Sequence, residues 1–330
     1  LVTVTGVSGS GKSSLVRDVI YESVAAIVSG RRGKRGSSGG AVGCDAIAGV
    51  ERIERVLEVD QTPIGKTPRS TPATYIGVWD EIRKLFASLP ESRMRGYTAS
   101  RFSFNTAGGR CEVCKGQGVN RIEMSFLPDV VVQCDECGGD RFTQETLAVR
   151  FKERSIADVL AMDVEEAVEF FGAQPKIRNA LALLAEVGLG YLTLGQQSPT
   201  LSGGEAQRIK LVSELARSST TTERLAQQRQ GLRATAPSAL YILDEPTVGL
   251  HMADVDQLIT VLRRLVATGA TVLVIEHNLD LVAASDWVID LGPEGGVDGG
   301  RVVAAGRPGE IVQTDGSYTG RFLAPYVAGS

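Results

Sequence analysis

The sequence has few aromatic residues and no long apolar run. Aromatic residues make up 5% of the 330 residues, which argues against aromatic stacking as the main mode of recognition. No stretch approaches the roughly 18 uninterrupted apolar residues that a membrane helix needs, and the N-terminus lacks a charged region followed by an apolar signal segment. These absences exclude a helical membrane span and predict a cytoplasmic protein.

The chain also lacks a strong excess of charge of either sign. Its formal net charge is −4, which excludes a uniformly basic DNA-binding surface. Residues 66–121 nevertheless hold ten Lys or Arg against four Asp or Glu, a local net charge of +6. Such a segment can face phosphates, although a solvated basic surface without a function is an equally good interpretation of charge alone.

The first residues, Leu1–Thr5, form a β-branched run typical of a strand, and no initiator methionine precedes them. We therefore expect the chain to be a fragment of a longer protein. Hydrophobic content of 43% and a mean hydropathy near zero are ordinary for a globular protein with a sizeable core.

A phosphate-binding loop follows this first strand. Residues 6–13 fit the pattern G-x-x-x-x-G-K-[ST], and a helix-like run, Ser14–Ile20, comes next. Glycines let the backbone approach phosphate oxygens, the lysine reaches the β- and γ-phosphates, and Ser13 is a candidate Mg²⁺ ligand. The candidate nucleotide-binding residues are Gly6, Ser8, Gly9, Ser10, Gly11, Lys12, Ser13 and Ser14.

Two later apolar strands end in polar residues. Residues 240–243 lead into Asp244 and Glu245, and residues 271–275 lead into Glu276 and His277. Buried parallel strands deliver such groups to one edge of a sheet, beside the phosphate loop. We expect Asp244 to orient Mg²⁺, Glu245 to polarise the attacking water, and His277 to contact the γ-phosphate; a purely structural histidine is the alternative.

The segment Leu201–Glu205 reads Leu-Ser-Gly-Gly-Glu and precedes a helix-like run, residues 206–216. This pattern is the signature of ABC-type ATPases, in which it completes the nucleotide site of a partner unit. The candidate signature residues are Ser202, Gly203, Gly204 and Glu205. Gln61 matches the Q-loop of these ATPases, which contacts the Mg²⁺ and the γ-phosphate, and residues 247–251 take the place of their D-loop.

About 140 residues separate Gln61 from Ser202, which indicates an insertion. Within it stand two C-x-x-C pairs, formed by Cys111, Cys114, Cys134 and Cys137, with 19 residues between the pairs. Four thiolates at this spacing are typical of a closed structural zinc site. Two disulfides or a redox site are the alternatives, and the fifth cysteine, Cys44, has no expected partner.

Taken in order, these motifs resemble the UvrA family. The resemblance rests on the phosphate loop, the segments 60–70, 102–105 and 108–111, the signature, and residues 286–296. It covers nearly the full chain. It implies an ATPase of nucleotide excision repair that binds double-stranded DNA, recognises distortion, dimerises and acts with UvrB as part of an excinuclease, with ATP, Mg²⁺ and Zn²⁺ as cofactors.

The resemblance leaves other functions open. The single ATPase unit implies a second unit in a missing half and a homodimer mate, and the long segment 215–240 favours a UvrA-like paralogue associated with tolerance of DNA-binding drugs. A transporter ATPase shares the nucleotide motifs but not the cysteine pairs. Candidate contacts to DNA phosphates are Lys66, Arg69, Arg93, Arg95, Arg101, Arg110, Lys115 and Arg121.

We expect an α/β fold, an ABC-type P-loop ATPase core with an inserted, mainly helical domain that holds the zinc. Residues 1–66 and 200–330 are predicted to form the ATP-binding core, and residues 67–199 the insertion. The segment 29–43, rich in Gly and Ser, is predicted to be a loop. Ser155 is expected to cap a helix with core positions at Ile156, Val159, Leu160, Ala167, Phe170 and Phe171.

Overall fold

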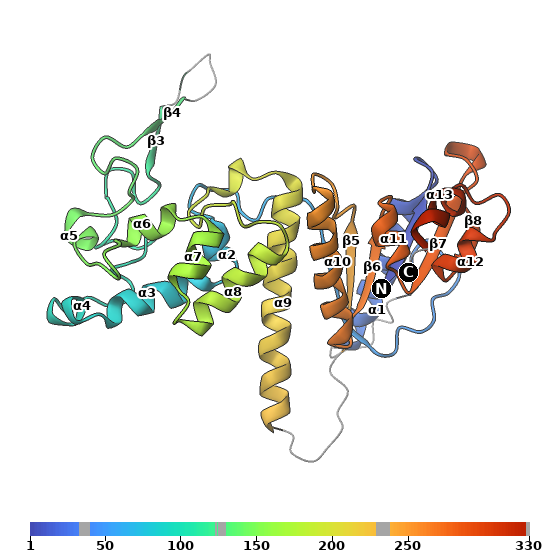
Figure 1. The fold of residues 1–330 in the computed structure, drawn as a ribbon, viewed down its shortest axis with the longest axis horizontal. Coiled ribbons are helices and arrows are strands. Elements are labelled where there is room, and N and C mark those ends of the chain that lie inside the picture. The colour runs from blue at the N-terminus through green and yellow to red at the C-terminus, as the bar shows by residue number, and fades with distance from the viewer. Residues whose placement is uncertain (33–39, 123, 125–129, 229–237, 328–330) are drawn as a thin grey trace. The chain divides into compact units, whose positions relative to one another are not determined.

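The structure, a computed structural model, describes residues 1–32, 40–122, 124, 130–228 and 238–327 (Figure 1). The chain divides into two compact units, one formed by Leu1–Gln61 with Arg217–Ser330 and the other by Thr62–Ala216. We call them the sheet unit and the cysteine unit. The signature segment, which the sequence places with the ATP-binding core, falls within the cysteine unit by this division.

A six-stranded sheet forms the centre of the sheet unit, in the order β2-β5-β6-β1-β7-β8. All neighbouring strands are parallel except the last pair, because β8 runs antiparallel to β7. The strands are β1 Val2–Gly6, β2 Ile53–Val59, β5 Ser238–Asp244, β6 Thr271–Ile275, β7 Trp287–Gly292 and β8 Arg301–Gly306. The two apolar strands predicted before Asp244 and Glu276 are confirmed.

Helices cover both faces of this sheet. On β7, Ile289 packs with the cluster that contains Val24 and Val28 of α1, whereas its neighbour Val288 packs with Leu323 of α13. Adjacent residues of a strand point to opposite faces, so α1 and α13 lie on opposite sides of the sheet (Figure 1). Helix α10 packs against β6 and α11.

The helical elements of the sheet unit begin directly after the phosphate loop with a π-helical segment. They are η1 Ser14–Tyr21, α1 Glu22–Arg32, α10 Met252–Ala267, α11 Leu279–Ala283, η3 Gly296–Asp298, α12 Pro308–Val312 and α13 Tyr318–Val327. The prediction of a loop over 29–43 is wrong at its start, because α1 extends to Arg32. Residues 33–39 of that loop and residues 229–237 of the segment 215–240 lie outside the described residues.

Short helices dominate the cysteine unit. They are α2 Pro72–Tyr75, α3 Val78–Ser88, α4 Pro90–Met94, α5 Gln144–Leu147, α6 Ile156–Ala161, α7 Val164–Phe170, α8 Pro175–Glu186, η2 Ser198–Thr200 and the beginning of α9 Gly203–Gln228. The Ser155 cap is confirmed, with its side chain accepting from the Asp158 amide. The single helix expected there is two, because Met162 is extended and Asp163 caps α7.

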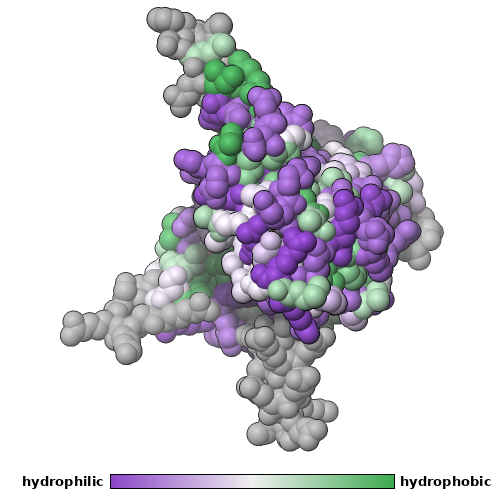
Figure 2. Space-filling model, turned by 90° about the vertical axis from the view of Figure 1, so that its left-hand side faces the viewer, coloured by the Kyte–Doolittle hydropathy of each residue, from purple (hydrophilic) through white to green (hydrophobic). Residues whose placement is uncertain are grey.

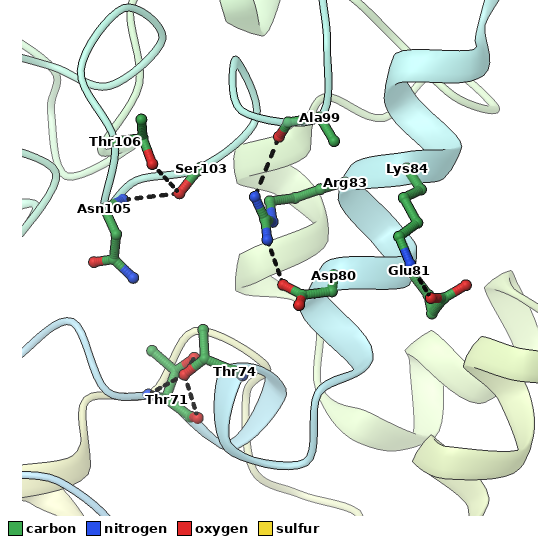
Figure 3. A network of polar contacts seen from close by, with 10 residues as sticks. All are labelled: Thr71, Thr74, Asp80, Glu81, Arg83, Lys84, Ala99, Ser103, Asn105 and Thr106. Carbon is green, nitrogen blue, oxygen red and sulfur yellow. Dashed lines mark hydrogen bonds and ion pairs between the residues drawn. The ribbon is translucent and has the colours of Figure 1, made fainter.

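Local polar contacts fix the turn before α3 (Figure 3). Thr71 and Thr74 form a reciprocal capping box at the start of α2. On α3, the Arg83 guanidinium pairs with the Asp80 carboxylate and also donates to the Ala99 carbonyl at 3.4 Å. A capping box such as that of Thr71 and Thr74 stabilises a helix by about 1 kcal/mol. The hydrogen bond from Arg83 to Ala99 joins α3 to the chain segment that leads into the first cysteine pair.

A two-stranded antiparallel hairpin, β3 Val119–Ile122 and β4 Val130–Gln133, joins the two cysteine pairs. The valines of β4 are exposed, Val131 at 55%, and Figure 2 shows hydrophobic residues gathered on this arm above a mostly hydrophilic face. A two-stranded hairpin of this kind has little stability by itself, so it depends on the cysteine pairs at its base.

None of the helices in the part of the chain that the structure describes is long and apolar enough to cross a membrane.

Candidate functional site

The phosphate loop follows β1 in the sheet unit, between that strand and η1. Gly6 has a φ of 132°, and a Cβ there would lie 1.9 Å from the Leu291 carbonyl oxygen, so only glycine fits against β7. Gly9 and Gly11 also have positive φ, at 77° and 87°. The loop therefore has the backbone shape that turns successive N–H groups toward an anion.

Lys12 folds back into its own loop. Its ammonium donates to the carbonyls of Gly6 at 3.2 Å and Val7 at 2.8 Å, and it is 7% exposed. Burial lowers the Lys12 pKa, and the nearby charges of Glu245 and Asp244 act in the opposite direction. Two of the three donors of the ammonium are therefore used by carbonyls of its own loop.

Ser10 differs from the other serines of the phosphate loop. Its hydroxyl is buried and has no hydrogen-bond partner among the described residues, whereas Ser8, Ser13 and Ser14 are exposed. A buried hydroxyl without a partner is uncommon. The neighbouring loop braces this segment from outside, since the Gly300 amide donates to the Ser10 carbonyl at 3.2 Å.

The acidic end of β5 lies at the same sheet edge, one strand away from β1 across β6. Asp244 pairs with Arg17 of η1 at 3.4 Å, and Arg17 also donates to Glu58 of β2 at 2.5 Å. Burial raises the Asp244 pKa, and the Arg17 charge opposes that shift. The structure thus brings together Lys12 and Asp244, and it adds Arg17, which the sequence patterns did not single out.

Glu245 and His277 face one another at the ends of β5 and β6. The His277 Nε2 lies 3.9 Å from the Glu245 Oε1, and both side chains are close to half exposed. Glu245 has a φ of 44°, which is uncommon for a residue other than glycine and clusters at functional sites. Gln61 is exposed, at the end of the first segment of the sheet unit.

The signature segment starts α9 through a capping box in the cysteine unit. The Glu205 amide donates to the Ser202 hydroxyl at 3.3 Å, and the Ser202 amide donates to the Glu205 carboxylate at 2.7 Å. The Tyr191 hydroxyl donates to the same carboxylate at 2.5 Å, and burial together with this bond raises the Tyr191 pKa to about 12. Gly203 and Gly204 form the first residues of the helix.

The four cysteines of the two C-x-x-C motifs form one buried cluster in the cysteine unit. Their sulfurs all lie within 4.8 Å of one another, with 4.0 Å between Cys111 and Cys134 and 3.7 Å between Cys114 and Cys137. These separations exceed the roughly 2.05 Å of a disulfide, and all five cysteines are free. The disulfide alternative is therefore wrong for this structure.

The cluster fits a tetrahedral zinc site. Zinc about 2.3 Å from four sulfurs sets the sulfurs about 3.8 Å apart, close to the two separations above. Burial raises the Cys137 pKa to about 12, whereas backbone N–H donors lower the Cys134 pKa. Gly116 makes the first knuckle possible, because a Cβ there would lie 1.9 Å from the Phe104 carbonyl oxygen.

Arg141 connects the second cysteine pair to the rest of the cysteine unit. Its guanidinium is buried and donates to the Gly195 carbonyl at 2.9 Å and the Pro68 carbonyl at 3.4 Å. Burial lowers the Arg141 pKa, while thiolate charge on Cys114 raises it. No sequence motif predicts this role for Arg141. Its position directly after the C-x-x-C-G-G-D segment is the feature of the sequence that could have indicated it.

The candidate DNA contacts separate into three groups. Arg95, Arg101 and Arg110 bind carboxylates of their own unit, Glu91, Glu145 and Glu112. Two more, Arg93 and Lys115, are exposed, and neither forms an ion pair with a carboxylate of the part of the chain that the structure describes. The remaining three, Lys66, Arg69 and Arg121, line one cavity of about 630 Å³ between the chain before α2, the hairpin and η2.

The parallel sheet, the phosphate loop and the acidic strand end define the chain as an ABC-type P-loop ATPase fold, here with a buried four-cysteine cluster of the kind that binds zinc. No family model matches the chain. It is 52% identical over 323 residues to UvrABC system protein A of Staphylococcus aureus (strain COL) and 52% identical over 325 residues to that of Staphylococcus epidermidis (strain ATCC 12228 / FDA PCI 1200). Each match covers 98% of this chain and 32% of the relative.

A solved structure gives the same result for the fold. The crystal structure of UvrA2 from Deinococcus radiodurans matches 99% of this chain and 36% of its own, with a TM-score of 0.80 and 48% sequence identity. The chain is UvrA-like in sequence and in fold along nearly its whole length, so the resemblance predicted from the motifs is confirmed. It spans about a third of the length of the curated relatives it matches.

Proposed function

We propose that this chain is the ATP-hydrolysing part of a DNA-repair subunit that recognises damaged or distorted duplex DNA. The observation that carries the proposal is the meeting of Lys12, Asp244 and Glu245 at one sheet edge in a chain 52% identical to UvrABC system protein A. The four-cysteine cluster favours this function over a transporter ATPase, and no observation favours drug tolerance.

The proposed nucleotide site divides its tasks among residues of the sheet unit. Bound ATP with Mg²⁺ supplies the phosphoryl group that is transferred to water. The loop N–H groups and Lys12 hold the phosphates, Ser13 and Asp244 hold the metal, and Glu245 takes the proton of the attacking water. His277 lies within reach of Glu245 and orients the γ-phosphate, with Gln61 as a further contact to the metal.

The signature is proposed to complete the site of a second ATPase unit. Ser202 caps the N-terminus of α9, and helix N-termini attract phosphate. Glu205 holds that N-terminus by its two bonds to Ser202 and its bond to Tyr191. A second unit, in the remaining length of the protein or in a homodimer mate, provides the nucleotide for this surface.

The cavity of the cysteine unit is the proposed contact to DNA phosphates. Lys66, Arg69 and Arg121 bring three positive charges to its lining, and each phosphate contact of this kind releases counterions, so binding weakens as salt rises. Zinc at the four cysteines would hold the hairpin that carries Arg121. Distortion sensing follows if a lesion lowers the energy of bending the duplex onto this surface. UvrB as a partner and the cytoplasm as location belong to the same proposal.

The test uses the full-length, zinc-loaded protein and fluorescence anisotropy on a duplex with and without one bulky adduct, in the presence and absence of ATP, over a salt series. Preference for the adducted duplex that changes with nucleotide supports the proposal. Binding that ignores both the adduct and ATP would overturn it.

Hydrolysis is tested in the same protein by Glu245→Gln. Loss of the carboxylate that accepts the proton should slow turnover about 100-fold or more while ATP still binds. Turnover close to that of the unaltered protein would assign proton transfer to another group. A matched control is Glu51→Gln, which changes an exposed glutamate of the same unit.

A further inference from the structure

Glu276 is a buried carboxylate at the end of β6, between the strand and His277. It is 2% exposed, and its amide continues the sheet by donating to the Val4 carbonyl at 3.1 Å. The mechanism proposed above gives this residue no task. A buried carboxylate is costly unless it is fully hydrogen-bonded, so its partners show what it does.

Four donors surround the Glu276 carboxylate, two for each oxygen. Oε1 accepts from the Thr247 amide at 2.9 Å and from the Thr247 hydroxyl. Oε2 accepts from the amides of His277 at 2.6 Å and Asn278 at 2.8 Å. An ionised carboxylate has about four lone-pair sites, and hydrogen bonds to it are among the stronger ones in proteins.

The donors come from two separate loops. Thr247 lies two residues after Glu245, in the segment that follows β5. His277 and Asn278 follow β6, and the Asn278 side chain also accepts from the first amides of α11. One side chain thereby joins the segment that carries the proposed base to the segment that carries the proposed γ-phosphate contact.

The two side chains so joined are only partly enclosed by the described residues around them. The side chains of Glu245 and His277 are 45% and 46% exposed, with 3.9 Å between them. The backbone of Glu245 is in the left-handed region and is held by its amide bond to the Ile275 carbonyl at 2.9 Å. Their relative placement therefore depends on the backbone of the two loops, which Glu276 fixes.

We propose that Glu276 is a positioning residue that locks the loop after β5 to the loop after β6 and so holds Glu245 and His277 in register for ATP hydrolysis. This inference rests on the proposed function. A Glu276 variant should then lose activity because the two loops shift. Nucleotide binding should not weaken, because the phosphate loop binds the nucleotide.

The first experiment is Glu276→Gln in the full-length protein. Glutamine has the same shape, but its NH₂ group faces two donors, so one loop loses its partner. We expect kcat to fall about 10- to 100-fold while the KM for ATP stays within about twofold, because displacement of catalytic groups by even 1 Å has effects of this size. A wild-type kcat in this folded variant would overturn the proposal, and so would a loss confined to KM.

Thr247 provides a milder variant that does not alter the buried charge. Thr247→Val removes the hydroxyl bond but keeps the amide bond, and kcat should fall several-fold, whereas Thr247→Ser should restore wild-type kcat within about twofold. Glu51→Gln serves as the exposed control. Equal kcat in the Val and Ser variants would contradict a role for the hydroxyl bond in positioning.

Hydrogen exchange separates failure of this inference from failure of the proposed function. The amides of Thr247, His277 and Asn278 should be protected in the unaltered protein and exchange about 10- to 100-fold faster in Glu276→Gln, with amides of β7 unchanged. This readout needs no hydrolysis. If the protein does not hydrolyse ATP, the proposed function fails, while unchanged exchange at all three amides would overturn the lock itself.

Discussion

The interiors of the sheet unit and the cysteine unit both contain aliphatic side chains but differ in their phenylalanine content. In the sheet unit, the strands supply Val, Ile and Leu, such as Val4, Ile242 and Ile275, each at most 1% exposed. In the cysteine unit, short helices surround phenylalanine rings, with Phe86 and Phe102 centred 5.6 Å apart, and four cysteines close the loop-rich part. Eight of the nine phenylalanines fall in residues 62–216.

This difference shows that one chain can stabilise its parts through independent means. Apolar strands gain stability from area removed from water, about 25 cal/mol per Å². The hairpin between the cysteine pairs buries little apolar area, since its β4 valines are exposed, and a metal would supply folding free energy to this region. The two regions should therefore respond separately to perturbation.

The largest separation is expected on removal of zinc. A chelator should raise amide exchange across residues 104–122 and 130–142 by about 1000-fold or more and leave β1 and β6 nearly unchanged, because zinc binding and folding are expected to be linked in the cysteine unit. Hydrogen exchange with mass spectrometry measures both regions in one sample.

Two cysteine substitutions control that experiment. Cys134→Ser should bind no zinc and reproduce the effect of the chelator. Cys44→Ser alters an exposed cysteine that lies outside the cluster and should keep one zinc per chain. Equal protection of both regions after chelation would show that the metal does not hold the cysteine unit.

A smaller effect, in the opposite region, is expected from Lys12→Ala. Loss of the ammonium that we propose binds the β- and γ-phosphates should weaken ATP affinity about 10- to 100-fold, with zinc content unchanged. Isothermal titration with ATP and metal analysis of the same sample measure the two. Lys176→Ala, an exposed lysine on α8, is the control, and an ATP affinity unaffected by Lys12→Ala would contradict the phosphate-loop assignment.

The smallest effect is expected at the capping box of α9. Glu205→Ala removes the acceptor of the Ser202 amide and the Tyr191 hydroxyl, so the free energy of unfolding of the cysteine unit should fall by about 1 kcal/mol. Tyr191→Phe removes one bond and should cost less. Denaturant titration followed by fluorescence measures both, and a larger loss in the Phe variant would show that the tyrosine hydroxyl contributes more than the capping carboxylate.

The sequence predicts the local parts of both regions well. The phosphate loop, the strands that end at Asp244 and Ile275, and the C-x-x-C pairs are each encoded in a short segment, because glycine placement, β-branched runs and ligand spacing act over a few residues. The Ser155 cap is predicted for the same reason. The convergence of the two cysteine pairs required only their spacing and the preference of zinc for four ligands.

Contacts between distant segments could not be predicted in this way. Arg17, Glu58 and Asp244 meet because η1, β2 and β5 lie side by side, and nothing in the three local sequences specifies that. Two of the four donors to the Glu276 carboxylate come from Thr247, which lies 29 residues earlier in the chain. The apolar pattern after Ser155 predicts one helix, whereas the structure has two because Asp163 caps a second one, α7.

The left-handed backbone at Glu245 implies a tension between stability and chemistry. A side chain on such backbone costs about 1 kcal/mol or more, which glycine would avoid. Glu245→Gly should therefore unfold at a higher temperature than Glu245→Ala, although neither variant keeps the carboxylate. Selection for thermal stability alone would favour glycine at this position, so a glutamate there fits the role proposed for Glu245 as the base.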